Sequence, residues 1–152
     1  MQKFTVNVFI NRSQQGVFDF LSDPVNLPKW DSDFESAEWI LSDAPGIGSI
    51  YRASGKRLGS QKDGLFEIIQ WDRPNRYSYK VKERMFLFEQ AETAITLKPK
   101  DNGTEATCEY QFEIVGRLKF AEGFVARMGK KRIEGNFENA KRLLEAECLI
   151  VP

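Results

Sequence analysis

The most constraining feature of this sequence is a two-residue alternation that changes to a helical period in the last third of the chain. From Ala106 to Ile114 every second residue is apolar, and the residues between them are polar. Such alternation is typical of a strand in an antiparallel sheet with one buried and one solvated face. After Gly116 the apolar residues recur at helical spacing. A C-terminal helix is therefore expected to cover the apolar face of a sheet.

Strand signals separated by turns fill most of the chain before this change. Alternating or apolar runs predict strands at residues 3–10, 34–41, 49–56, 65–72, 76–83, 88–98 and 106–114. Asp101-Asn102-Gly103-Thr104 predicts a hairpin turn, because Asn and Gly tolerate positive φ. Ser13 is a suitable N-cap for a short helix to residue 22, and residues 26–30 predict a second helical turn.

The predicted C-terminal helix covers residues 118–148, about 45 Å at ~1.5 Å per residue. Its apolar positions are Phe120, Phe124, Met128, Ile133, Phe137, Ala140, Leu144 and Cys148. The step from Met128 to Ile133 is five residues and contains Gly129. The helix is therefore either continuous or broken into two at this glycine.

Composition excludes several classes of protein. The 152 residues carry 22 basic and 22 acidic side chains, so a net charge of zero gives no overall attraction to nucleic acid. Apolar runs are far shorter than the ~20 residues of a membrane span. We expect one soluble domain over residues 1–152, with neither a nucleic-acid partner nor a membrane span. The first residues do not resemble a secretion signal, which favours a cytoplasmic protein.

The chain has no histidine, which excludes His-dependent catalytic triads and the common His-containing zinc sites. Cys108 and Cys148 belong to no CxxC pair, and we interpret them as free, buried thiols. No metal and no cofactor are expected. Asp31, Asp33 and Glu35 form an acidic cluster, interpreted as a solvated loop because a metal site needs more ligands.

Local motifs resemble those of a known family. The segments Val17-Phe18-Asp19-Phe20-Leu21-Ser22-Asp23-Pro24 and Leu27-Pro28-Lys29-Trp30 resemble the opening of polyketide cyclase/dehydrase-like proteins in the SRPBCC superfamily. Gly46-Ile47-Gly48-Ser49-Ile50-Tyr51, Arg73-Pro74 and Asn102-Gly103-Thr104 lie where that family would place them. The resemblance covers nearly the whole chain. It implies an α+β, START-like helix-grip fold: a curved antiparallel sheet of about seven strands around a long C-terminal helix, with two short helices after the first strand.

The resemblance also implies a deep cavity between sheet and helix. Relatives bind lipids, sterols, polyketides or plant hormones there, and some cyclise or dehydrate polyketides. Large apolar and aromatic side chains suit the lining of such a cavity, although the same residues also suit an ordinary filled core. The candidate ligand-binding residues are Trp39, Tyr51, Phe66, Tyr79, Tyr110, Phe112, Phe120, Phe124 and Met128.

No catalytic motif is carried over from the family, and Glu89 is a weak candidate for a catalytic residue. Glu89 lies two residues before Ala91 and four before Thr93, so a regular strand would place all three on one face. The carboxylate of Glu89 would then point into the cavity, where burial would raise its pKa. The alternative, which we favour, is a bulge near residues 86–88 that turns Glu89 outward.

A basic segment begins the predicted helix. It carries six basic residues and one acidic residue, a formal charge of +5: Arg117, Lys119, Glu122, Arg127, Lys130, Lys131 and Arg132. It would attract an anionic ligand or a membrane surface, but a solvated helix face is the commoner reason for such a pattern.

Three functions remain open. The first is binding of a hydrophobic or aromatic small molecule, or a lipid, in the cavity. The second is an enzyme of the polyketide cyclase/dehydratase type. The third is a protein-interaction module that docks through the basic segment or residues 31–38, and this hypothesis predicts a filled core without a pocket. The sequence does not define an oligomeric state.

Overall fold

A seven-stranded antiparallel sheet forms the body of the computed structural model, which describes residues 1–41, 44–55, 64–83 and 88–147. The strands are β1 (Gln2–Ile10), β2 (Ser36–Leu41), β3 (Ile50–Ser54), β4 (Gly64–Asp72), β5 (Arg76–Val81), β6 (Phe88–Lys100) and β7 (Gly103–Ile114). Their order across the sheet is β1-β7-β6-β5-β4-β3-β2. Consecutive strands therefore pair from β2 to β7, and β1 joins at the β7 edge.

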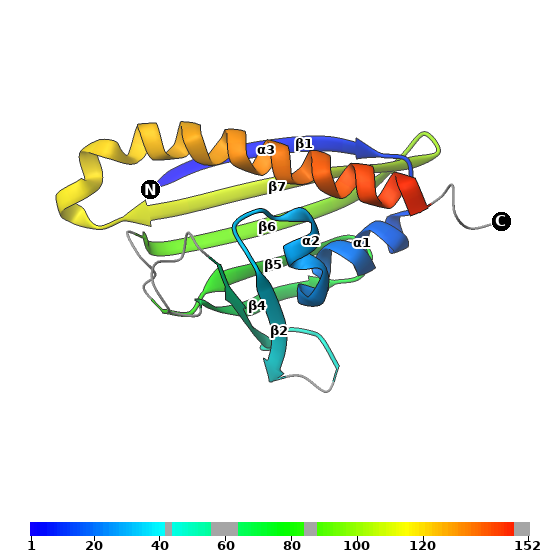
Figure 1. The fold of residues 1–152 in the computed structure, drawn as a ribbon, viewed down its shortest axis with the longest axis horizontal. Helices are drawn as coiled ribbons and strands as arrows, with labels where there is room; N and C mark the ends of the chain where they lie inside the picture. Colours follow the sequence, from blue (N-terminus) through cyan, green and yellow to red (C-terminus); the bar gives the residue numbers. More distant parts are fainter. Residues whose placement is uncertain (42–43, 56–63, 84–87, 148–152) are drawn as a thin grey trace.

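Helices lie on one side of this sheet, as Figure 1 shows. They are α1 (Gln14–Ser22), the 3-10 turn η1 (Pro24–Asn26), α2 (Leu27–Trp30), the 3-10 segment η3 (Gly116–Ala121) and α3 (Glu122–Glu147). The long helix α3 runs along β1, and α1 and α2 lie near its C-terminal half. The predicted helix-grip fold is confirmed, including the two short helices after the first strand.

Local sequence explains α1 well. The Ser13 side chain accepts a hydrogen bond from the backbone N–H of Gly16 (3.1 Å), which satisfies one of the otherwise unpaired donors of the first turn. Val17, Phe18 and Leu21 form the buried stripe of the helix. Capping and periodicity agree here, and the predicted helix matches the observed one within a residue.

The β6–β7 hairpin differs from its prediction in detail. Lys100 pairs with Gly103, so the turn consists of Asp101 and Asn102, and the positive φ (52°) falls on Asp101. Gly103 lies within β7, where a Cβ atom would be 2.5 Å from the carbonyl oxygen of Ile10. The glycine is thus required by the close approach of β1 rather than by the turn.

A β-bulge interrupts the two-residue alternation of β4. The register between β4 and β5 shifts between Ile68 and Gln70, so that one residue on β4 has no direct partner. The bulge lets Phe66, Ile68 and Trp71 all pack on the core side of the sheet. A strict two-residue period does not reproduce this pattern.

Helix α3 is continuous through Gly129, which decides between the two alternatives. The glycine is buried against β1, and a Cβ atom there would be 3.5 Å from the ring of Phe4. The 3-10 segment η3 takes the place of the first predicted helical residues, and Cys148 lies outside the described residues. None of the helices in the described ranges is both long and apolar enough to cross a membrane.

Candidate ligand-binding site

A cavity of about 490 Å³ lies between the sheet and α3. Side chains from β3 to β7 form one wall, α3 forms the opposite wall, and the segment after α2 contributes residues at one side. The lining is mostly aliphatic and aromatic. A concave apolar site with a few polar groups is the usual form of a small-molecule site.

Strand pairing places the aromatic side chains of the sheet wall side by side. Tyr51 on β3 pairs with Phe66 on β4, and their rings stack with centroids 5.0 Å apart and planes 12° apart. Tyr79 on β5 pairs with Thr93 on β6, which pairs in turn with Tyr110 on β7. Because paired residues share a face of the sheet, these rows form a continuous surface toward the cavity.

The hydroxyl groups of this wall stay protonated at neutral pH. Burial raises the pKa of Tyr51 and of Tyr79 well above the usual value of a phenol, and it raises the pKa of Tyr110 to about 12. Neutral phenols both donate and accept hydrogen bonds. The wall therefore offers apolar rings together with hydroxyl groups that orient a polar atom of a ligand.

The helix wall has two kinds of residue. Val125, Ile133 and Phe137 face the cavity and pack against the core. Phe124 and Met128 also line the cavity, yet they are 64% and 54% exposed. Side chains that contact both cavity and solvent mark the rim of the cavity, so the rim lies along the first turns of α3.

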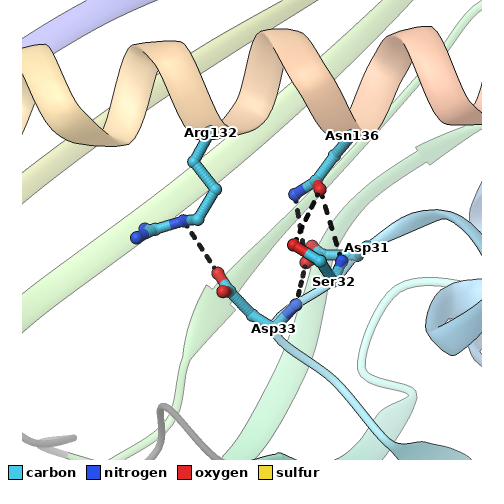
Figure 2. A network of polar contacts seen from close by, with 5 residues as sticks. All are labelled: Asp31, Ser32, Asp33, Arg132 and Asn136. Carbon is cyan, nitrogen blue, oxygen red and sulfur yellow. Dashed lines mark hydrogen bonds and ion pairs between the residues drawn. The ribbon is translucent and has the colours of Figure 1, made fainter.

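A cluster of polar side chains, which we term the polar corner, borders the same cavity (Figure 2). It consists of Asp31, Ser32, Asp33, Arg132 and Asn136. Asn136 donates from Nδ2 to Oδ1 of Asp31 (3.1 Å) and accepts from the backbone N–H and the hydroxyl of Ser32 (3.3 Å each). The backbone N–H of Asp33 donates to the same Asp31 oxygen (3.0 Å). Two turns of α3 thereby hold the segment that follows α2.

An ion pair completes the polar corner. Nε of Arg132 lies 2.9 Å from Oδ2 of Asp33, and both side chains are largely shielded from bulk solvent. Figure 2 shows the terminal nitrogens of the guanidinium pointing away from Asp33. Gly55 permits this arrangement, because a Cβ atom there would be 1.8 Å from the carbonyl oxygen of Asp33. A guanidinium held by one carboxylate keeps further N–H donors for an oxygen atom of a ligand.

Asp31 has an unusual acidity. Burial raises the pKa of its carboxyl to about 6, and the neighbouring Asp33 adds to the rise, whereas the hydrogen bonds from the Asp33 N–H and Asn136 and the charge of Arg132 oppose it. The side chain borders the cavity. A carboxyl group of this kind exchanges its proton close to neutral pH, as a general acid or base must.

The prediction that Asp31 and Asp33 belong to a solvated acidic loop is wrong. Both line the cavity, because Arg132 and Asn136 on α3 bind them across a sequence separation of about 100 residues. The interpretation of the basic segment as a solvated face is likewise wrong for Arg132. No local pattern distinguishes Arg132 from its basic neighbours, and only the position of α3 over the sheet does so.

Six of the nine predicted ligand-binding residues line the cavity: Tyr51, Phe66, Tyr79, Tyr110, Phe124 and Met128. Three do not lie on it. Trp39 packs beside the wall against Tyr51 and Trp71, and Phe112 is buried against Phe88 and Tyr110.

The third is Phe120, which is 87% exposed on η3. Its four-residue spacing from Phe124 assumed a regular α-helix, and η3 is a 3-10 segment at the end of the sheet. The expectation that it faces the sheet is wrong.

The structure also decides between the alternatives for Glu89 and shows where Trp30 lies. Glu89 is exposed, and the β6–β7 register shifts between Phe88 and Gln90, as expected if a bulge turns it outward. Trp30 is buried, lines the cavity and packs on Phe137 with ring centroids 5.5 Å apart. It therefore both closes one side of the cavity and packs the second short helix.

Thiol and metal chemistry find little support here. Burial raises the pKa of the Cys108 thiol to about 12, so Cys108 carries no nucleophilic thiolate at neutral pH. Among the described residues, no three His, Cys, Asp or Glu side chains gather as a metal site would require. The polar chemistry of the cavity rests on carboxyl, guanidinium, amide and hydroxyl groups.

A family model for "Polyketide cyclase / dehydrase and lipid transport" matches residues 1–145. The chain belongs to this family. The resemblance of the opening motifs is thereby confirmed. No curated protein is similar enough in sequence to count as a match.

Solved structures share the fold at low sequence identity. TTHA0849 from Thermus thermophilus is 16% identical, with a TM-score of 0.77 over 96% of this chain and 99% of that chain. Ara h 8.0201 is 16% identical, with a TM-score of 0.74 over 95% and 98%. One structure is the di-domain ARO/CYC protein BexL from the BE-7585A biosynthetic pathway. It is 11% identical, with a TM-score of 0.79 over 100% of this chain and 48% of that chain. At these identities the likeness concerns the fold alone.

Proposed function

We propose that this protein binds a small hydrophobic or aromatic molecule in the cavity between the sheet and α3. The observation that carries the proposal is an apolar cavity of about 490 Å³ with one polar corner. Burial of apolar ligand surface supplies affinity at about 25 cal/mol per Å². The family description includes both polyketide cyclases and lipid transport, which is consistent with an apolar ligand.

The polar corner defines the ligand further. Arg132 supplies N–H donors, and Asp31 supplies an acceptor when ionised and a donor when protonated. An oxygen-bearing ligand, such as a phenol, enol or ketone, satisfies these groups. A pure hydrocarbon leaves them without a ligand partner, which costs binding free energy. We therefore propose an aromatic or polycyclic ligand with oxygen at the end near Asp31.

Six predicted residues are proposed to contact this ligand: Tyr51, Phe66, Tyr79, Tyr110, Phe124 and Met128. Trp39 and Phe112 are proposed to support the wall from the side, because they pack on Tyr51 and Tyr110. Phe120 has no part in this site. The cytoplasmic location expected from the sequence remains a prediction.

The first test is native mass spectrometry of the freshly purified protein, repeated after denaturation. We expect an additional mass that is lost on denaturation and that identifies the ligand class. Binding is then measured by titration with prodan, an uncharged naphthyl ketone whose emission shifts to the blue in an apolar environment.

A cavity-filling variant makes this titration decisive. Ala91 lines the cavity on β6, and Ala91→Trp places an indole in the space of the ligand. We expect at least a tenfold weaker affinity for prodan. Glu92→Phe is the matched control, because the neighbouring residue points to the opposite face of the same strand. Equal affinity of Ala91→Trp and the unmodified protein would contradict binding in this cavity.

A double variant tests the polar end of the ligand. Asp33→Asn with Arg132→Met removes both partners of the ion pair, so that neither remains as an uncompensated charge. We expect about tenfold weaker binding of prodan and unchanged binding of naphthalene, which has no oxygen. A parallel loss for both molecules would show that the polar corner only maintains the shape of the cavity.

A second function, polyketide cyclisation or dehydration, is favoured by Asp31. A carboxylate with a pKa of about 6 on the cavity wall is suited to take a proton from the carbon between two carbonyls of a folded polyketone. Arg132 and the tyrosine hydroxyls would stabilise the resulting enolate oxygen. The cavity would contribute by holding the flexible chain in a reactive shape.

Turnover of a poly-β-ketone thioester separates this function from binding alone. If Asp31 is the base, activity rises with pH through about 6, and Asp31→Asn lowers the turnover rate at least 100-fold with prodan affinity changed less than threefold. Absence of turnover in the unmodified protein would favour a carrier. The interaction-module hypothesis required a filled core, and the cavity counts against it.

A further inference from the structure

The outer face of η3 and the first turns of α3 carries large apolar side chains in solvent. Phe120, Phe124 and Met128 are 87%, 64% and 54% exposed; Phe120 lies on η3, and Phe124 and Met128 lie one turn apart on α3. The opposite side of α3 packs against the rest of the protein. Gly129 contacts β1, and Glu122 accepts a hydrogen bond from the backbone N–H of Ile114 (3.3 Å). The three side chains therefore form a stripe that no described element covers.

Basic side chains flank this stripe. Five of them are exposed: Arg117, Lys119, Arg127, Lys130 and Lys131. Between residues 116 and 131 the one acidic side chain is Glu122, which is buried. The chain as a whole has no net charge, so this face is a local concentration of positive charge, although Lys119 is paired with Glu113 at 3.3 Å. We name the three apolar and five basic residues the basic aromatic face.

We propose that the basic aromatic face docks onto a lipid bilayer that contains anionic lipids. A helix that presents aromatic and thioether side chains between lysines and arginines matches the boundary of such a bilayer, where apolar groups insert and cations meet lipid phosphates. The face is a convex helix surface, and its long basic side chains keep their charges in water while their stems cover apolar surface. Charge complementarity selects an anionic lipid over a neutral one.

Docking in this way would bring the cavity to the membrane. Phe124 and Met128 belong both to the basic aromatic face and to the cavity rim. A hydrophobic ligand would then pass between bilayer and cavity without crossing water. This consequence rests on the proposed ligand binding, whereas the docking itself depends only on the surface.

The test is sedimentation with vesicles of phosphatidylcholine containing 30% phosphatidylglycerol, compared with vesicles of phosphatidylcholine alone. We expect at least tenfold tighter binding to the anionic vesicles and a marked loss at 0.5 M NaCl. Phe120→Ser and the double variant Lys130→Glu/Lys131→Glu should each weaken the binding at least fivefold. Phe120 is chosen because it does not line the cavity.

Matched controls use equivalent residues elsewhere on the surface. Ile47→Ser removes another side chain that is 74% exposed, and Lys98→Glu reverses an exposed charge on β6. Both should leave vesicle binding unchanged, and Phe120→Ser should leave prodan affinity within twofold. Failure of ligand binding is thus recognised separately from failure of docking.

Three results would overturn the proposal: no sedimentation with anionic vesicles, equal binding to neutral vesicles, or binding that Phe120→Ser does not change. Binding of poly-glutamate through the same residues, without vesicle binding, would also overturn it and indicate an acidic protein partner.

Discussion

The two halves of the C-terminal helical segment carry the same sequence signal in opposite surroundings. Phe120, Phe124 and Met128 recur every four residues and are more than half exposed. Farther along, Phe137, Ala140 and Leu144 recur at three- and four-residue steps and are almost completely buried. Apolar periodicity shows that one side of a helix is hydrophobic, but it does not show what covers that side.

The cavity accounts for the difference. Phe137 still borders the cavity, and beyond it the C-terminal turns of α3 pack on a filled core, to which α1, α2 and the sheet contribute. The preceding half covers the open space between α3 and the sheet, and its outermost residues reach the rim. Where the core is filled, the apolar side chains of α3 pack against it. Where the cavity opens, the apolar side chains remain available to contact a ligand or another surface.

The largest expected effect lies in the filled half. Leu144→Ala deletes a side chain that is 1% exposed and leaves a void, so the free energy of unfolding should fall by about 3 kcal/mol. Urea denaturation followed by circular dichroism measures this change. A loss below about 1 kcal/mol would mean that the two halves differ less in packing than the structure indicates.

A pH-dependent effect is expected where the two halves meet, at the polar corner. The pKa of Asp31 is raised from 3.8 to about 6, so the folded state binds this proton more tightly than the unfolded state. Its protonation therefore stabilises the fold below about pH 4, and that stabilisation is lost as pH rises to about 6.

Asp31→Asn removes this titration and should raise the free energy of unfolding by about 3 kcal/mol at pH 7.5. The difference between variant and unmodified protein should vanish near pH 3.5, where both side chains are neutral. A difference independent of pH would contradict the raised pKa.

A smaller effect of opposite sign to that of Leu144→Ala is expected at the boundary between the halves. Gly129→Ala adds a methyl group in ordinary contact with Phe4 and replaces a poor helix former. The free energy of unfolding should rise by about 0.5–1 kcal/mol, measured by the same denaturation. Destabilisation would indicate that the helix needs flexibility at this glycine.

The smallest effect on stability is expected at Phe120. Phe120→Ala removes a side chain that is 87% exposed, so the free energy of unfolding should stay within about 0.5 kcal/mol. Thermal and urea denaturation check this. Strong destabilisation would show that Phe120 packs against the protein in solution. It would contradict the contrast between the exposed and the buried half of the helical segment.

The aromatic wall and the polar corner differ in how far the sequence predicts them. Tyr79 and Tyr110 lie on strands whose alternation is local, so their shared face follows from sequence spacing and hairpin connections. Asp31 reaches the cavity through contacts with α3 that no spacing encodes. Glu89 shows the same limit within a strand, because a single bulge reverses the face that parity predicts.

Periodicity, capping and turn chemistry predict the order of the elements, the cap of α1 and most of the aromatic wall, because these signals act over a few residues. The helix-grip fold itself is expected from the resemblance of the local motifs to a known family. The meeting of Asp31, Asp33, Arg132 and Asn136 at the cavity, and the exposure of Phe120, follow only from the packing of distant segments. Burial and electrostatic pairing depend on which surfaces the fold brings together, so residues that look alike in sequence have different environments.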